Sequence, residues 1–187
     1  MKKTACFVVA AAIILLASSA AGQDCGPLNL QFQPYAPAVN PGDPLYDEWV
    51  PLIAEHFGLD PAGFGWCWTQ RVVGTIPGTW VTCGGDDLFV PNPFGIGDGP
   101  DLYGNPGVLF NKRGEVYTMS WGLSRFDSEF NWLAFGGLTH YDGETGRYTD
   151  AEGWGTDRPK HYPPTYWIRS AGYFCYPEDD EGKPGTA

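Results

Sequence analysis

The sequence contains none of the short motifs that mark the common transferase and hydrolase sites. It has no nucleophile elbow, no His-Glu-x-x-His helix, no phosphate-binding loop and no dinucleotide fingerprint. Basic residues are also scarce, with 11 Lys and Arg against 22 Asp and Glu, a formal net charge of −11. An acidic surface repels nucleic-acid phosphates and anionic lipids. We therefore expect no acyl or phosphoryl transferase, and neither nucleic acid nor membrane as a partner.

Long apolar runs are missing as well, apart from one near the start of the chain. Lys2 and Lys3 precede an apolar run over residues 7–16, and small residues fill 17–22. This order is typical of a secretory signal peptide, and the run is too short for a comfortable bilayer span. We expect cleavage after Ala21 and a soluble exported product, secreted or periplasmic. Nine basic and 22 acidic residues then remain, a net charge of −13.

Cysteine patterns that bind metals are absent too. No two cysteines form a CxxC motif, and the three histidines lie far from every cysteine in the sequence. Cys6 leaves with the signal peptide, so an even number of cysteines enters an oxidising compartment. They are Cys25, Cys67, Cys83 and Cys175. We expect two disulfides, no metal and no cofactor.

Local pattern favours one of the three possible pairings of four cysteines. Residues 66–83 consist of two alternating segments around a turn-rich stretch, which predicts a hairpin. Folding at that turn puts Cys67 opposite Cys83, at the short Cβ separation that a disulfide needs. Cys25 then pairs with Cys175 and ties the start of the exported chain to its end.

Glycine, proline and aromatic residues are what the chain has in abundance. The 26 Gly and 17 Pro are spread throughout, while eight Trp and ten Tyr argue against plain disorder. We expect a mainly β fold, an antiparallel barrel or sandwich with one N-terminal helix and two disulfides. The expected divisions are a signal peptide at 1–21, an extended Pro-rich arm at 22–43, a single β-rich domain at 44–176 and a disordered acidic tail at 177–187.

One helix is predicted at the start of this domain. Asp43 suits the N-cap, Pro44 suits the first helical position, and Gly58 ends the segment. The apolar positions that recur every four residues are Leu45, Trp49, Ile53 and Phe57. Pro51 is expected to kink or split the helix after Val50. We interpret His56 as an exposed helix-end residue.

Beyond the helix the sequence period is close to two. Residues 115–123 predict a strand on which Tyr117, Met119, Trp121 and Leu123 share one face. Such a face of large side chains needs cover from another part of the molecule.

The stretch 86–107 is rich in Asp, Gly, Pro and Asn, and we expect it to lack regular structure. Its acidic residues Asp86, Asp87, Asp98 and Asp101 could supply oxygen ligands to calcium. No spacing matches a known calcium loop, and Asp-Gly clusters commonly form turns. Calcium binding here is left open, and no metal site is predicted.

Residues 145–153, with the sequence Thr-Gly-Arg-Tyr-Thr-Asp-Ala-Glu-Gly, follow the pair Gly136 and Gly137. This segment resembles the Gly-rich signature of the allene oxide cyclase and dirigent-type barrels. The resemblance implies a small eight-stranded barrel and chemistry without a cofactor. The signature positions have physical roles in such a barrel: Gly146 and Gly153 permit tight backbone, Tyr148 fills the barrel and Ala151 lets backbone approach. No catalytic residue of that family aligns with this chain.

Two groups of side chains are candidates for a functional site. The candidates for acid and base chemistry are His140, Asp127 and Glu129. The candidates for ligand binding are Trp121, Trp132, Trp154, Tyr141, Tyr166 and Arg125, because aromatic rings stack on the C–H faces of sugars and line small-molecule sites. Most tryptophans of a domain this size are expected in the core.

These observations predict a non-catalytic, exported binding protein for a small apolar or sugar-like ligand, held in a barrel mouth or on an aromatic face. The first alternative is a cofactor-free cyclase or dirigent-type stereocontrol protein, in which the barrel confines a reactive intermediate. The second is a structural exported protein without a ligand. A cavity lined by aromatic side chains with one or two buried ionisable groups would favour the cyclase, and a flat exposed row of tryptophans would favour sugar binding. The absence of both would favour the structural protein.

Overall fold

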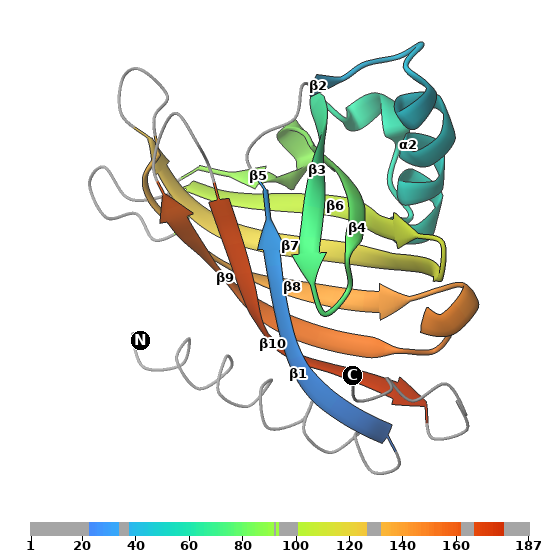
Figure 1. The fold of residues 1–187 in the computed structure, drawn as a ribbon. Coiled ribbons are helices and arrows are strands. Elements are labelled where there is room, and N and C mark those ends of the chain that lie inside the picture. Colours follow the sequence, from blue (N-terminus) through green and yellow to red (C-terminus); the bar gives the residue numbers. More distant parts are fainter. Residues whose placement is uncertain are drawn as a thin grey trace, which may run out of the picture.

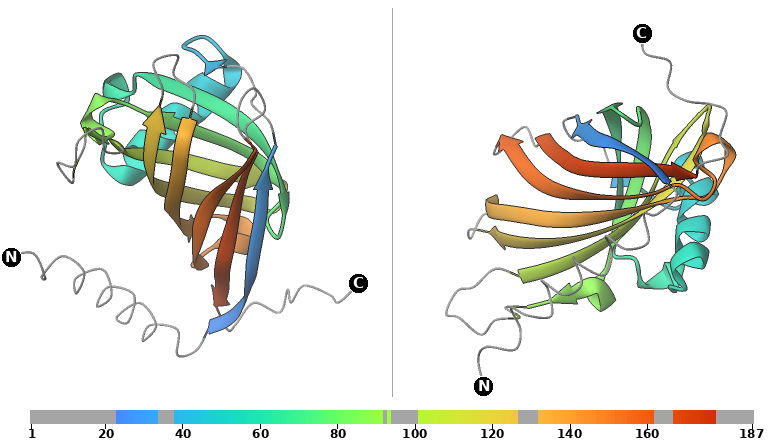
Figure 2. Two further views of the ribbon diagram at one scale, coloured as in Figure 1. Left: turned by 90° about the vertical axis from the view of Figure 1, so that its left-hand side faces the viewer. Right: turned by 90° about the horizontal axis from the view of Figure 1, so that it is seen from below.

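The computed structural model describes residues 23–33, 38–91, 93, 101–126, 132–161 and 167–177. Eight antiparallel strands form a closed barrel, which confirms the expected fold class (Figures 1 and 2). The barrel strands are β1 (Gln23–Phe32), β3 (Trp66–Gly74), β4 (Gly78–Gly84), β6 (Asp101–Asn111), β7 (Gly114–Phe126), β8 (Trp132–Gly143), β9 (Glu152–His161) and β10 (Trp167–Pro177). Closure leaves no long unpaired sheet edge along this path.

Strand β1 closes the barrel. It pairs with β10 along its whole length and with β3 through Leu30, Gln31 and Phe32, so it lies between them (Figure 1). Two short strands add to the rims: β2 (Ala38–Val39) pairs with β3, and β5 (Phe89–Val90) pairs with β6. The segment 22–43, expected to be an arm ahead of the domain, thus supplies one barrel strand. Pairing of β1 with β10, far along the chain, decides its place.

The described part of the stretch 86–107, which lacks 92 and 94–100, is more regular than expected. It contains a short 3-10 helix, η2 (Asp86–Leu88), the strand β5 and the first part of β6. Strand β6 pairs with β7 from Asp101 onward, and Pro106 is tolerated within it. Pairing with a long neighbouring strand outweighs the low strand propensity of Asp, Gly and Pro.

Helix α2 (Pro44–Phe57) packs on the outside of the barrel. The Asp43 carboxylate accepts a hydrogen bond from the Leu45 amide at 2.9 Å, and Gly58 ends the helix with φ 64°, as expected. Pro51 does not split the helix, because one helix runs through it, so that alternative of the prediction is wrong. Val50 and Ile53 are fully buried on either side of Pro51, and this tertiary packing outweighs the lost backbone hydrogen bond.

The apolar face of α2 covers part of the large-residue face of the sheet. Trp49 stacks on Phe110 of β6 with ring centroids 4.3 Å apart, and Tyr117 of β7 lies in the same cluster. The interpretation of His56 as an exposed helix-end residue is wrong. Its ring stacks on Tyr117 at 4.0 Å, and its Nε2 lies 3.3 Å from Oδ2 of Asp142. Burial, followed by nearby carboxylates, raises the pKa of Tyr117 to about 12.

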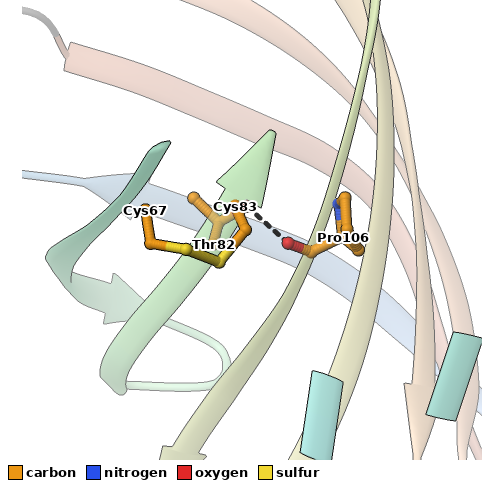
Figure 3. The surroundings of a disulfide bond; sticks show 4 residues. All are labelled: Cys67, Thr82, Cys83 and Pro106. Carbon is orange, nitrogen blue, oxygen red and sulfur yellow. Dashed lines mark hydrogen bonds between the residues drawn. A yellow bond between two sulfur atoms is a disulfide. The ribbon is translucent and has the colours of Figure 1, made fainter. Parts of the chain in front are cut away.

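Both expected disulfides are present. Cys67 and Cys83 are directly opposed on β3 and β4, with Cα atoms 4.1 Å apart, and they lie in a cluster with Val39 and Val50 (Figure 3). Next to them, Thr82 faces the other way and donates from Oγ1 to the carbonyl of Pro106 at 2.9 Å. Cys25 and Cys175 are opposed on β1 and β10, with Cα atoms 3.9 Å apart.

One end of the barrel is filled by apolar side chains. The 3-10 helix η3 (Gly146–Tyr148) connects β8 to β9 there, and Tyr148, Ala151 and Phe174 are buried together with residues from β1, β3, β4, β6 and β7. Tyr148 therefore fills this end of the barrel, as expected, and Ala151 is buried beside it. The other end, where β9 ends and β3 begins, carries the polar part of the lining.

Candidate functional site

Hydroxyl groups and one carboxyl group gather in the barrel lining. They come from alternate residues of neighbouring strands: Thr118 and Ser120 on β7, Thr139 and Tyr141 on β8, Asp157 on β9, and Ser170 on β10. Strand register places Ser120 opposite Thr139, and Asp157 opposite Ser170. Tyr141 and Ser170 are 0% exposed and Asp157 is 6% exposed. Polar groups this deeply buried require hydrogen-bond partners.

A chain of hydrogen bonds connects these side chains. The Ser120 and Thr139 hydroxyls are 2.7 Å apart, and Thr139 donates from Oγ1 to Oδ2 of Asp157. Separately, the Tyr141 hydroxyl donates to Oγ of Ser170 at 2.8 Å. Oδ1 of Asp157 is buried and has no hydrogen bond of normal geometry from any described residue. Asp157 thus presents one unused acceptor inside the barrel.

The surroundings of Asp157 favour its neutral form. Burial raises the pKa of its carboxyl above the ordinary value, and the nearby hydroxyls of Thr139 and Ser170 oppose this only in part. Burial also raises the pKa of Tyr141 well above 10, and the negative charge of Asp157 adds to that effect. A carboxyl held in this way can accept a hydrogen bond when ionised and donate one when neutral.

The raised pKa of Asp157 predicts how folding stability depends on pH. In the unfolded chain Asp titrates near 3.9, so as the pH rises the unfolded chain loses this proton first. The folded chain keeps this proton to a higher pH. The free energy of unfolding of the wild type therefore falls as the pH rises from the unfolded pKa to the folded pKa, and it stays constant above the folded pKa. An Asp157→Asn variant has no such proton. Urea unfolding from about pH 3 to about pH 8 should show the variant gaining stability relative to wild type as the pH rises.

The opposite pH dependence of stability would contradict this prediction. If the wild type gained stability relative to Asp157→Asn over that interval, the carboxyl would be stabilised as an anion, and the assignment of burial as the dominant effect would be wrong. Asp150→Asn serves as the matched control, because Asp150 is exposed and Asn tolerates its φ of 59°.

Glycine opposite the hydroxyls makes room for this arrangement. Gly155 of β9 pairs with Thr139 on one side and Gly172 on the other. A Cβ added at Gly155 would lie 2.2 Å from Oγ of Ser170 and 3.3 Å from a ring carbon of Tyr141. The hydrogen-bonded pair of Tyr141 and Ser170 therefore occupies the space that a side chain at this position would take.

Two aromatic side chains lie on one face of β3, at the end of the barrel where β9 ends and β3 begins. Trp66 and Trp68 alternate with Cys67, which faces the helix, and their rings are nearly parallel, with centroids 6.5 Å apart. Trp66 is 39% exposed and covers Gly84, where an added Cβ would come within 2.5 Å of its ring. Further inside, Trp80 donates from Nε1 to the Thr118 hydroxyl at 2.9 Å. This end therefore combines aromatic and hydrogen-bonding groups.

The structure separates the candidates named from the sequence. Tyr141 belongs to the lining, whereas its neighbour His140 lies on the outer face, as do Trp121 and Trp154. His140 is 3.0 Å from Glu152 through Nε2 and Oε1, and its ring centroid is 4.5 Å from that of Trp154. The strand period explains this division, because consecutive residues point to opposite sides of the wall.

Other candidates cannot be placed in either group. Asp127, Glu129 and Tyr166 lie outside the described residues. For Trp132 and Arg125 only the strand backbone is described, in β8 and β7. Asp98 of the calcium hypothesis also lies outside the described residues, and the described ones contain no group of three or more His, Cys, Asp or Glu that could hold a metal ion.

The sequence reasoning missed Asp157 and its hydroxyl partners. One signal was available: Gly153, Gly155 and Asp157 alternate along β9, which puts a carboxyl directly after two glycines on one face of the strand. In the structure this face is the barrel lining, and Trp154 and Thr156 lie on the outer face. The sequence of the segment alone does not identify which face is inside.

No helix in the described part of the chain has both the length and the apolar character needed to cross a membrane. Comparisons with protein families, with curated proteins and with solved structures find no match to this chain. The two disulfides are compatible with an exported protein.

Proposed function

We propose that this chain is an exported, non-catalytic binding protein, secreted or periplasmic, which holds a small apolar or sugar-like ligand in the polar part of its barrel lining. The observation that carries the proposal is Oδ1 of Asp157, a buried carboxyl oxygen to which no described residue donates a hydrogen bond of normal geometry. Leaving a buried acceptor unpaired costs about 1–3 kcal/mol. A hydroxyl group of a ligand would remove that cost by donating to it.

The chemistry of the lining limits the ligand. Asp157 and the net charge of −11 disfavour an anion, so the ligand is neutral or cationic and carries at least one donor. Trp66 and Trp68 offer ring faces at the same end, and these favour an apolar or C–H-rich surface next to that donor. A hydroxylated terpenoid, a phenol or a sugar meets both conditions.

Intrinsic tryptophan fluorescence gives a direct test, because Trp80 donates a hydrogen bond to Thr118 of the polar lining. Titration with geraniol, phenol and glucose should show saturable quenching or a spectral shift for at least one of these probes. A hydrogen bond to an ionised carboxyl contributes about 1.5–3 kcal/mol, so at a pH high enough to ionise Asp157 the Asp157→Asn substitution should weaken that binding about tenfold to a hundredfold.

The Asp150→Asn variant should bind as tightly as wild type, since Asp150 lies on the surface. Equal affinity of Asp157→Asn and wild type would remove Asp157 from the site. If no probe of any of the three classes bound, the alternative of a structural exported protein without a ligand would be favoured.

A second function, that of a cofactor-free cyclase of the dirigent type, is favoured by one observation. The raised pKa of Asp157 makes its neutral form available as a proton donor inside a confined lining. Chromatography of the ligand after incubation separates the two functions. A binding protein returns it unchanged, whereas a cyclase returns an isomer of the same mass.

A further inference from the structure

The outer face of the barrel over β7 to β10 exposes large apolar side chains. Trp121 is 41% exposed, Leu138 is 44% exposed and Tyr173 is 39% exposed. Trp121 and Leu138 are directly opposed on β7 and β8, and the Trp121 ring lies over Gly104 of β6. Helix α2 packs elsewhere on the barrel, on β4, β6 and the first part of β7 (Figure 1). Exposed patches of this kind commonly mark interaction surfaces.

The ladder between β9 and β10 crosses this face as four outward-facing pairs, here called the outer strip. In order along the strands they are Glu152 with Cys175, Trp154 with Tyr173, Thr156 with Ala171, and Arg158 with Arg169. The strip therefore begins with a carboxylate, continues with two aromatic rings and two small side chains, and ends with two arginines. Trp, Tyr and Arg are the residues most enriched at the energetic centres of protein interfaces.

The charges at both ends of the strip are open to a partner. Arg158 and Arg169 place like charges opposite each other, and neither forms an ion pair with any described residue. Arg169 donates from Nε to Oδ1 of Asn29 at 3.1 Å, a neutral acceptor. At the other end Glu152 contacts His140, but its side chain stays 43% exposed.

We propose that the outer strip is the interface of a two-fold symmetric dimer, with a second copy of this chain as its occupant. Glu152 and Arg158 are six residues apart on β9, with Gly155 midway. We place a two-fold axis at Gly155, in the plane of the interface and perpendicular to the strands. Rotation about this axis puts Glu152 of each copy opposite Arg158 of the other. Such an isologous contact is the commonest form of protein dimer.

The same axis also matches the shapes of the strip. Trp154 and Tyr173 then face Thr156 and Ala171 of the second copy, so that large rings pack over small side chains. The patch formed by Trp121 and Leu138 extends the contact onto β7 and β8. A small ligand is a poorer fit, because ligand sites enclose most of the ligand surface and this face is open. The net charge of −11 opposes association in general, but at physiological ionic strength charges more than about 8 Å apart are largely screened.

Sedimentation velocity of the secreted form tests this arrangement. Wild type should show a concentration-dependent dimer. Glu152→Arg and Arg158→Glu each place like charges across the interface, so each variant alone should dimerise at least tenfold more weakly. Mixed in equal amounts, the two variants should form a heterodimer, because both cross-interface pairs are then complementary. Only a two-fold pairing of these two positions predicts that rescue.

The control is Arg113→Glu, which reverses an exposed charge in the turn between β6 and β7 and should leave dimerisation unchanged. A wild type that stays monomeric at the highest soluble concentration would overturn the proposal. So would a mixture of the two variants that remains monomeric. Binding of polygalacturonate to a monomeric wild type, lost in Arg158→Glu, would instead assign the strip to an anionic polysaccharide.

Discussion

Replacing Cys25 and Cys175 together with alanine is expected to lower the free energy of unfolding by about 5 kcal/mol. The bond closes a loop of 150 residues, and the chain-entropy model gives about 5 kcal/mol for a loop of that length. It also clamps the first part of β1 to the last part of β10, whereas β1 closes the barrel on β3 through residues 30–32. Urea unfolding followed by tryptophan fluorescence measures the loss.

The second disulfide provides the comparison. Cys67 and Cys83 are 16 residues apart, and the same model gives about 3 kcal/mol for their removal. Amide exchange at Leu28 and Leu30 should become faster only when the bond between β1 and β10 is absent, because those residues belong to β1. A smaller loss for the Cys25 and Cys175 pair than for the hairpin pair would show that β1 is held by its sheet pairing alone.

Gly172→Ala is expected to destabilise the barrel by about 3 kcal/mol, at the upper end of the range for overpacking. An added Cβ would lie 1.8 Å from the carbonyl oxygen of Trp154 and 2.8 Å from Cα of Gly155. Both contacts are with backbone, so no change of rotamer relieves them and β9 must move away from β10. Because Asp157 and Ser170 are paired on the same two strands, ligand binding at the proposed site should weaken as well.

Gly26→Ala is the matched control for this prediction. Gly26 lies on β1, next to β10, and a Cβ added there meets no atom within 4 Å. The thermal unfolding midpoint should fall for Gly172→Ala and remain close to wild type for Gly26→Ala. Equal midpoints for both variants would mean that β9 and β10 separate without cost, which contradicts a tightly paired wall.

The two proposed sites use opposite faces of the same strand. On β9, Gly153, Gly155 and Asp157 belong to the lining, whereas Trp154, Thr156 and Arg158 belong to the outer strip. The two proposals can therefore be tested separately. Asp157→Asn changes a buried group and should leave dimerisation intact, while Arg158→Glu changes the surface and should leave ligand binding intact.

Local signals accounted for the elements whose structure depends on neighbours in sequence. The N-cap at Asp43, the αL cap at Gly58 and the hairpin that pairs Cys67 with Cys83 follow from a few adjacent residues. The pairing of Cys25 with Cys175 followed by elimination. The break at Pro51 failed as a prediction because it weighed the backbone alone, without the buried side chains on either side.

The candidate site was less predictable, for a reason visible in β8. His140 and Tyr141 are consecutive, and either could have been the inward residue. Tertiary structure buries Tyr141 against Ser170 and leaves His140 beside Glu152 on the surface. Trp121 and Trp154, named as candidates for ligand binding, lie on the outer face and not at the barrel mouth. The resemblance to allene oxide cyclase and dirigent-type barrels stays a prediction.

The sequence alone predicted an exported, acidic, mainly β chain with one capped helix and two disulfides. These predictions rest on composition and on patterns among neighbouring residues: charge, apolar runs, turn residues and cysteine spacing. Only the tertiary structure decided that the sheet closes into a barrel, that β1 belongs to it, and that Asp157 faces inward among hydroxyl groups. These features depend on pairing between residues as far apart as Cys25 and Cys175. A period of two shows that a strand has two faces, but only closure of the sheet determines which of them is inside.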